Sequence, residues 1–219
     1  PLTSGGTFNF TVDWGDGSGI ETVTAYDDAD ATHAYTSAGT YTVTIDGTIE
    51  GWSFVSQTAQ RNKIKTISNW GGLTLNAGSC FESCQQLEIT ANNAPTLAGS
   101  PPTMHRAFYD CQKIVNIGTG WDVSSVQDFS YALSNCPLMN ATDTVNRNIG
   151  SATNLNNMFY YSLAYNQNIS GWNTSNVTNM AGMFRFNTSF NQNIGVWNTS
   201  NVTTFSYMFA ETNNPFNNG

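Results

Sequence analysis

A motif that recurs every 25 residues constrains the fold of this chain more than any other sequence feature. The segment Trp172–Thr178 returns unchanged as Trp197–Thr203. Weaker copies extend the same frame towards the N-terminus, where the residue that closes each motif recurs at spacings of 27, 25, 26, 25 and 25. These closing residues are Phe81, Phe108, Leu133, Phe159, Phe184 and Phe209. One unit of this length cannot bury its apolar face alone, so the period predicts coils that stack and share a core.

Each repeat unit combines a helix-like pattern with an extended one. Val177, Met180 and Phe184 stand at i, i+3 and i+7, the spacing of one face of a short helix. Ser175 or Thr174, just before them, is suited to cap such a helix. The pattern predicts a mixed fold class: a right-handed, leucine-rich-repeat-like solenoid of about six coils, each of about 25 residues with a strand and a short helix.

A tryptophan stands twelve residues before the closing position in several units. These tryptophans are Trp121, Trp172 and Trp197. We expect them, with the closing phenylalanines, to be structural residues of the repeat. The middle units are irregular, because Leu133 replaces the closing Phe and Arg147 stands where a Trp is expected.

The first part of the chain has a different pattern. Phe8, Phe10, Val12 and Trp14 alternate with polar residues, which is the period of a strand, and a Gly-rich turn follows at 15–18. Further strand patterns occur at about 20–25, 40–45 and 52–55. We therefore expect a small antiparallel β unit over residues 1–58, packed as a cap on a repeat array over residues 59–219.

Two segments resemble known extracellular families. Residues 10–18, FTVDWGDGS, followed by His33-Ala34-Tyr35 and by residues 39–44, GTYTVT, resemble the PKD domain, a β-sandwich of extracellular proteins. Residues 107–114, AFYDCQKI, are similar to BspA-like leucine-rich repeats, and residues 190–203 are similar to their Asn-rich variant in bacterial surface proteins. The resemblance implies a surface-displayed adhesion or binding protein, and it supplies no catalytic residues. Similar repeats occur in virion-associated proteins.

The charge of the chain excludes several classes of partner. The net charge is −8, and the seven Lys and Arg residues form no cluster. A nucleic-acid partner and an anionic lipid surface both require grouped cations. No apolar run approaches the ~20 residues that cross a bilayer, so we expect no membrane insertion in this segment. The sequence begins without Met, and we expect it to be a piece of a longer chain.

Few residues suggest chemistry. His33 and His105 do not stand at metal-ligand spacing, and no nucleophile has an orienting base, so we expect a protein that is not an enzyme and has no cofactor. Asp27, Asp28 and Asp30 form an acidic loop for which calcium is the alternative interpretation. A solvated loop is favoured, because the Gly and the distal Glu of an EF-hand loop are missing.

The cysteines follow the repeat. Three cysteines stand three residues after the closing position of their units: Cys84, Cys111 and Cys136. Ser162 stands at the same position in a later unit. The favoured interpretation is a row of small buried residues. A disulfide between neighbouring coils is the alternative, since stacked positions fall within reach of one another. A zinc site that uses Cys80 and Cys84 is the weakest option.

The leading functional hypothesis is an extracellular, surface-displayed module that recognises a protein or a glycan. Residues that vary between the fixed positions would set its specificity. The candidates are Tyr160, Tyr161, Arg185 and Phe186. One alternative is a structural component of a virion, appendage or filament, in which the chain self-assembles. A second alternative is an accessory domain of a longer secreted enzyme.

Overall fold

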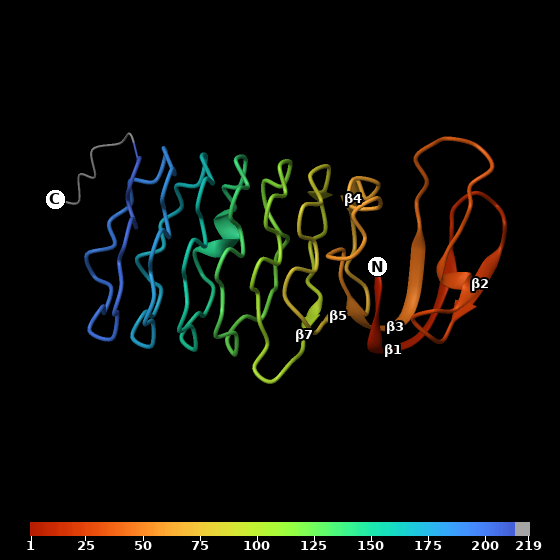
Figure 1. Cartoon of the computed structure of the whole chain (residues 1–219), viewed down its shortest axis with the longest axis horizontal. Helices are drawn as coiled ribbons and strands as arrows, with labels where there is room; N and C mark the ends of the chain where they lie inside the picture. The colour runs from red at the N-terminus through yellow and green to blue at the C-terminus, as the bar shows by residue number, and fades with distance from the viewer. Residues whose placement is uncertain (213–219) are drawn as a thin grey trace.

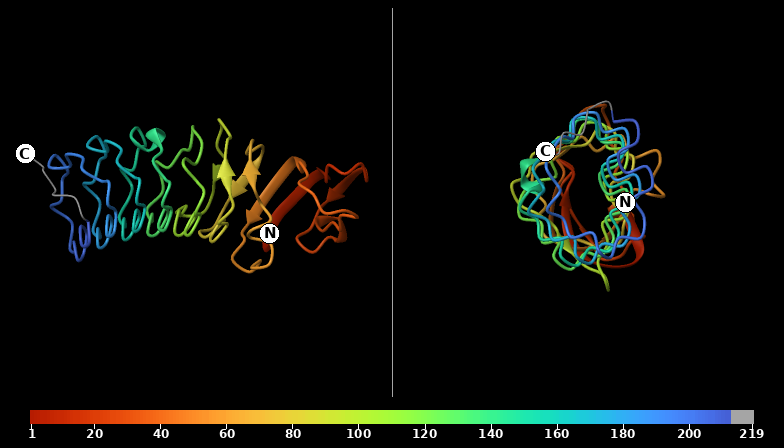
Figure 2. Two further views of the ribbon diagram at one scale, coloured as in Figure 1. Left: turned by 90° about the horizontal axis from the view of Figure 1, so that it is seen from above. Right: turned by 90° about the vertical axis from the view of Figure 1, so that its left-hand side faces the viewer.

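The computed structural model describes residues 1–212 and shows an elongated molecule. A β-sheet forms the N-terminal end, and successive coils of the chain follow along the long axis (Figure 1). Viewed down that axis, the coils superimpose as one oval outline (Figure 2). None of the helices in the described residues is both long enough and apolar enough to cross a membrane.

One mixed sheet joins the N-terminal unit to the first coils. It contains β1 (Leu2–Asp13), β2 (Ile20–Val23), β3 (Thr44–Trp52), β5 (Leu73–Leu75) and β7 (Thr96–Leu97) in the order β2-β1-β3-β5-β7. β1 runs antiparallel to both of its neighbours, whereas β3, β5 and β7 are parallel. Because β3 pairs with β5, the sheet passes across the domain boundary expected at residue 58. That boundary itself stays a prediction.

The apolar alternation in β1 explains its place in the sheet. Phe8, Phe10 and Val12 are buried, and they pack with Val23 and Ile49 of the neighbouring strands. β3 begins four residues later than the 40–45 pattern indicates and runs on to residue 52, so no separate strand follows at 52–55.

Parallel pairing continues along the coils. β4 (Thr66–Ile67) and β6 (Glu88–Ile89) form a two-stranded parallel sheet. Beyond them, single parallel bridges connect one residue of each coil to the same position of the next. The bridged residues are Thr103, Asp128, Asn154, Asn179 and Thr204. The sequence period is therefore the number of residues between hydrogen-bonded positions of adjacent coils.

The predicted fold class is wrong. Regular structure in residues 1–212 is almost entirely β, with the two sheets above and only two 3-10 turns, η1 (Ala29–Ala31) and η2 (Thr142–Thr144), so strand and short-helix coils of the leucine-rich-repeat type are absent there. Among the backbone hydrogen bonds of residues 177–187 there is none of the α-helical kind, from an N–H to the carbonyl four residues earlier. The N–H groups of Met180, Gly182 and Phe184 instead donate to carbonyls 24 residues later, in the next coil. Gly182 also has a left-handed backbone (φ 62°), which an α-helix does not tolerate.

Aromatic residues form rows in the interior. Phe81 stacks on Phe108, and Phe159 stacks on Phe184, with ring centroids 5.5 and 5.7 Å apart and planes within 6°. Phe209 continues the row at 5.8 Å from Phe184, and Trp172 stacks on Trp197 at 6.3 Å. The rows break in the middle, at Leu133 and Arg147.

Arg147 compensates in part for the Trp that it replaces. Its guanidinium donates to the carbonyls of Gly118 and Trp121 and pairs with Asp143. Burial lowers the pKa of Arg147, and Asp143 opposes that shift. A small cavity remains beside Leu133 at this break in the rows.

Candidate binding surface

Each coil carries two residues with a left-handed backbone, four positions apart, on the turn segment that crosses one side of the stack. Eleven are non-glycine residues with φ between 51° and 59°, and Gly182 takes the twelfth place. The pairs are Ser79 and Ser83, Arg106 and Asp110, Tyr131 and Asn135, Asn157 and Tyr161, Gly182 and Phe186, and Tyr207 and Glu211. We call the surface made by these residues, together with Glu82, Tyr109, Tyr160 and Arg185, the outer flank.

Backbone bonds hold the outer flank in register. The N–H of Arg106 donates to the carbonyl of Ser130, and that of Tyr131 donates to Asn156 one coil further on. The N–H groups of Tyr161 and Phe186 likewise donate to carbonyls of the next coil. These bonds involve only the main chain, so they form whichever side chains stand on the flank.

Aromatic and cationic side chains gather over the last three coils of the described part. The ring of Phe186 lies 5.6 Å from Tyr160 and 5.9 Å from Tyr161, measured between centroids. The guanidinium carbon of Arg185 lies 5.0 Å from the centroid of Phe186 and 5.1 Å from that of Tyr207. We call these five residues the aromatic patch. Tyr161 is 42% exposed and Tyr207 is 69% exposed, so the patch is open to a partner.

An ion pair fixes the cation of the aromatic patch. Arg185 Nε donates to one carboxylate oxygen of Glu211 at 2.8 Å, and Nη2 donates to the other at 3.2 Å. This hydrogen bonding raises the pKa of Arg185 and lowers that of Glu211. The two-point contact orients the planar guanidinium between Phe186 and Tyr207. Together with Glu211, the patch therefore presents rings and hydrogen-bonding groups without net charge.

The four binding candidates identified from the sequence all lie in this patch. Tyr160, Tyr161, Arg185 and Phe186 come from two adjacent coils and contact one another. Sequence reasoning did not identify Tyr207. The repeat frame holds a signal for it, because Tyr207 stands two residues before Phe209, as Tyr131 stands two before Leu133.

Asp28 of the acidic loop has a local structural role. The carboxylate of Asp28 accepts hydrogen bonds from the backbone N–H groups of Thr24 and Asp30, and these bonds lower its pKa. Asp28 thereby caps η1, whereas Asp27 and Asp30 are exposed. Across residues 1–212, no three His, Cys, Asp or Glu side chains are grouped so that they could hold a metal ion.

Both histidines have structural contacts. His33 Nε2 lies 2.8 Å from a carboxylate oxygen of Asp16, and its ring stacks on Trp14 at 5.2 Å. Hydrogen bonds from Ser18, then from His33, lower the pKa of Asp16 to about 2. His105 Nδ1 lies 2.7 Å from Ser130 Oγ.

All four cysteines are free and buried. The thiols of Cys111 and Cys136 donate to the carbonyls of Phe81 and Phe108 in the preceding coil, at 3.1 and 3.0 Å. Ser162 makes the equivalent bond to Leu133. Burial raises the pKa of Cys80, Cys84 and Cys136 to about 12, and it raises that of Cys111 well above the ordinary value. The structure thus contains a row of protonated thiols.

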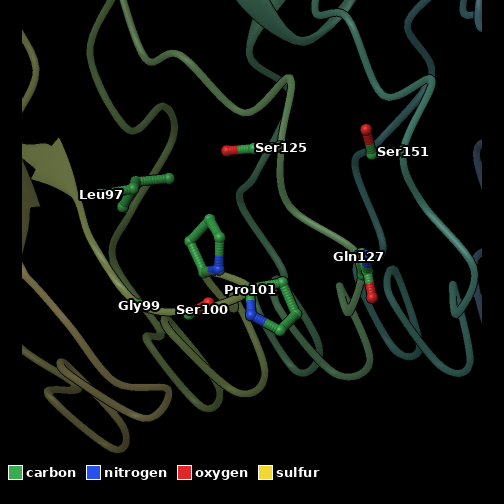
Figure 3. A pocket seen from close by; sticks show the side chains of 8 residues that line it. Leu97, Gly99, Ser100, Pro101, Ser125, Gln127 and Ser151 are labelled. Carbon is green, nitrogen blue, oxygen red and sulfur yellow. The ribbon is translucent and has the colours of Figure 1, made fainter.

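A shallow hollow lies on another side of the coils (Figure 3). The Gly99–Pro102 loop, which contains a cis Ser100–Pro101 bond, forms one wall. Ser125, Gln127 and Ser151 form the opposite wall. The hydroxyl and amide groups of this lining carry no charge, and we assign it no chemistry.

The coils match the model of a protein family. Residues 102–219 match the model of a family described as "Mycoplasma protein of unknown function, DUF285". The match includes the whole aromatic patch and covers more than half of the 219 residues. No curated protein and no solved structure matches the chain. Residues 1–101 lie outside the match, so the likeness of the N-terminal unit to a PKD domain stays a prediction.

Proposed function

Because this chain belongs to DUF285, a family of surface-associated repeat proteins of unknown function, we propose that it is a non-catalytic adhesion module. It acts outside the cell and attaches to a protein or glycan on another surface. The observation that carries this proposal is the aromatic patch, in which five side chains from three coils converge on one open surface. Exposed aromatic rings with a fixed arginine among them are typical of recognition surfaces.

The backbone under the patch supports the same conclusion. A left-handed backbone favours Gly and Asn, whereas bulky side chains in this region are strained. Tyr161, Phe186 and Tyr207 nevertheless occupy it, with φ of 56°, 58° and 59°. Asn157 and Gly182 hold the position of Tyr207 in other coils, and Asn135 holds the position of Tyr161 and Phe186, so the fold accepts the favoured residues at both positions. The bulky side chains are best explained by a role at the surface.

A binding experiment with a matched variant tests the proposal. Fluorescently labelled chain is applied to panels of intact animal, plant and bacterial cells, and the bound label is measured by flow cytometry. We expect the wild-type chain to bind one class of cells, and Tyr161→Asn/Phe186→Asn to bind it at least tenfold more weakly. Asn suits the left-handed backbone, so this double variant is expected to stay folded.

A second exposed tyrosine provides the control. Tyr26 is 48% exposed but lies in the N-terminal unit, away from the patch. Tyr26→Asn should bind as the wild type does. The proposal fails if the double variant binds cells as strongly as the control, or if no cell class retains the wild-type chain.

A further inference from the structure

A second cluster on the outer flank has the same construction as the aromatic patch. The guanidinium carbon of Arg106 lies 4.3 Å from the ring centroid of Tyr109 and 6.0 Å from that of Tyr131. The two rings are 6.2 Å apart, and Arg106 pairs with Glu82 at 3.0 Å. We call these four residues the proximal patch. In both patches an arginine lies near two rings and is neutralised by a glutamate of a neighbouring coil.

The two patches follow one another along the stack. Arg106 and Gly182 hold the same repeat position three coils apart, and Arg185 belongs to the coil of Gly182. With adjacent parallel segments about 4.8 Å apart, the coils that carry the two arginines are separated by roughly 15 Å along the stack. The proximal patch ends at Tyr131, and the aromatic patch begins in the next coil, at Tyr160. A ligand that contacts both arginines must therefore be extended.

The chemistry of the flank favours an uncharged partner. Glu82 neutralises Arg106, and Glu211 neutralises Arg185, so neither arginine is left to attract an ionic ligand. The carboxylate of Asp110, also on the flank, accepts hydrogen bonds from the amides of Gln85, Gln112 and Asn135 and disfavours an acidic ligand. The exposed groups are aromatic faces, phenol hydroxyls and amides. Aromatic rings stack on the C–H faces of sugar rings, while phenol and guanidinium groups bond to sugar hydroxyls. A neutral glycan matches both properties.

The shape of the aromatic surface favours a linear ligand over a protein. A stable protein interface buries about 800 Å² on each side around a contiguous, apolar centre. Here the rings follow the stack, one or two to a coil, from Tyr109 to Tyr207. A row of rings on a regular axis suits a polymer with a regular repeat.

We infer that the outer flank binds one extended, neutral polysaccharide chain at two points, the proximal patch and the aromatic patch. This inference rests on the proposed binding function and specifies its ligand. Backbone strain supports it independently, because Arg106 and Tyr131 also occupy left-handed positions, with φ of 51° and 57°. Occupation of both patches by one chain multiplies the two weak affinities through effective concentration.

The inference predicts that affinity depends on ligand length. The purified chain is titrated against an array of neutral glucan, mannan, galactan and xylan oligosaccharides of increasing length, with acidic glycans alongside. We expect one neutral series in which chains that span both patches bind at least tenfold more tightly than the shortest that bind. Tyr131→Asn should remove this gain by disabling the proximal patch, and Tyr161→Asn/Phe186→Asn should remove it by disabling the other. Tyr26→Asn should keep it.

The outcomes separate this inference from the proposed function. The inference is overturned if neutral oligosaccharides bind without length dependence, or if only acidic glycans bind. It is also overturned if cell binding persists without any glycan binding and is abolished by protease treatment of the cells. In that last case a protein is the partner, and the proposed adhesion function stands. If the chain binds neither cells nor glycans, the proposed function itself fails.

Discussion

The interior rows and the outer flank share the same coils and the same period, yet they differ in what repeats. In the interior the side chain repeats, since Phe159 and Phe184 stack with parallel planes and are fully buried. On the flank only the backbone repeats. The left-handed position held by Tyr131 is taken by Asn157 and then by Gly182 in the next two coils.

This difference separates the part of the chain that stabilises the stack from the part that is free to vary. Stacking requires the buried rings and the main-chain bonds between coils. Neither depends on which side chain stands on the flank. A repeat protein of this kind can therefore change its partner through flank residues while its interior stays constant.

The largest expected effect is the loss of an interior ring. Phe159 is fully buried, with its centroid 3.9 Å from Tyr165 and 5.7 Å from Phe184. Phe159→Ala should lower the free energy of unfolding by about 3–5 kcal/mol, because it leaves a cavity in the core. Urea unfolding measures the loss. The flank variant Phe186→Asn is the matched comparison and should change it by less than about 1 kcal/mol. Equal losses of unfolding free energy in the two variants would show that the flank stabilises the stack as much as the interior does.

The next effect is a loss of stability at alkaline pH from the interior thiols. The pKa of Cys136 rises from 9.0 to about 12 in the folded chain because of burial. The unfolded thiol therefore ionises first, so stability is intact below pH 9 and is lost as the pH rises towards 12. At pH 10 the ionisation of this thiol in the unfolded chain should lower the free energy of unfolding by roughly 1 kcal/mol.

The serine variant isolates the contribution of that thiol. Cys136→Ser keeps a donor for the carbonyl of Phe108, as Ser162 does for Leu133, but has no thiol to ionise. Unfolding free energies at pH 8 and pH 10 should therefore differ less for Cys136→Ser than for the wild type, by roughly 1 kcal/mol. Identical pH dependence would mean that Cys136 reaches solvent in the native state.

A smaller effect should come from the repair of the interrupted row. A cavity of about 20 Å³ lies beside Leu133, lined also by Phe129, Met158 and Arg147. Leu133→Phe restores the ring that the other coils have at this position and should stabilise the fold by about 0.5 kcal/mol, from ~24 cal/mol per Å³ of cavity filled. A rise in the urea midpoint checks it. A loss of more than about 1 kcal/mol would mean that the larger ring overpacks the site.

The sequence predicts the period and the positions of the buried rows, but not the local conformation. The spacing of Val177, Met180 and Phe184 fits a helix, but it does not distinguish a helix from successive turns. Turns also bring every third or fourth residue to the same side of the chain. The feature that excludes a helix is the direction of the N–H groups, which bond to the next coil. No pattern within a single unit reveals that bond.

The sequence predicts only part of the candidate site, because the repeat frame is clear in some units and irregular in others. Tyr160 and Phe186 stand at variable positions in regular repeats, so the sequence identifies them as surface residues. Arg106 and Tyr131 lie in less regular units, where the frame is harder to follow. Their left-handed backbone could not be predicted either. Such turns are recognised in a sequence by Gly or Asn, and these positions hold bulky residues instead.

The smallest expected change in stability concerns the most exposed ring of the aromatic patch. Tyr207 has a φ of 59°, is 69% exposed and lies near Arg185. Tyr207→Gly loses the contact with Arg185, worth about 0.5–1 kcal/mol at an exposed site, but relieves a similar backbone strain. The unfolding free energy should therefore stay within about 0.5 kcal/mol of the wild type. Tyr207→Ala loses the same contact and keeps the strain, so it should be less stable than Tyr207→Gly by about 1 kcal/mol. If the glycine variant instead unfolds as easily as Phe159→Ala, the ring of Tyr207 stabilises the stack, and the flank is part of the fold rather than a surface kept for a partner.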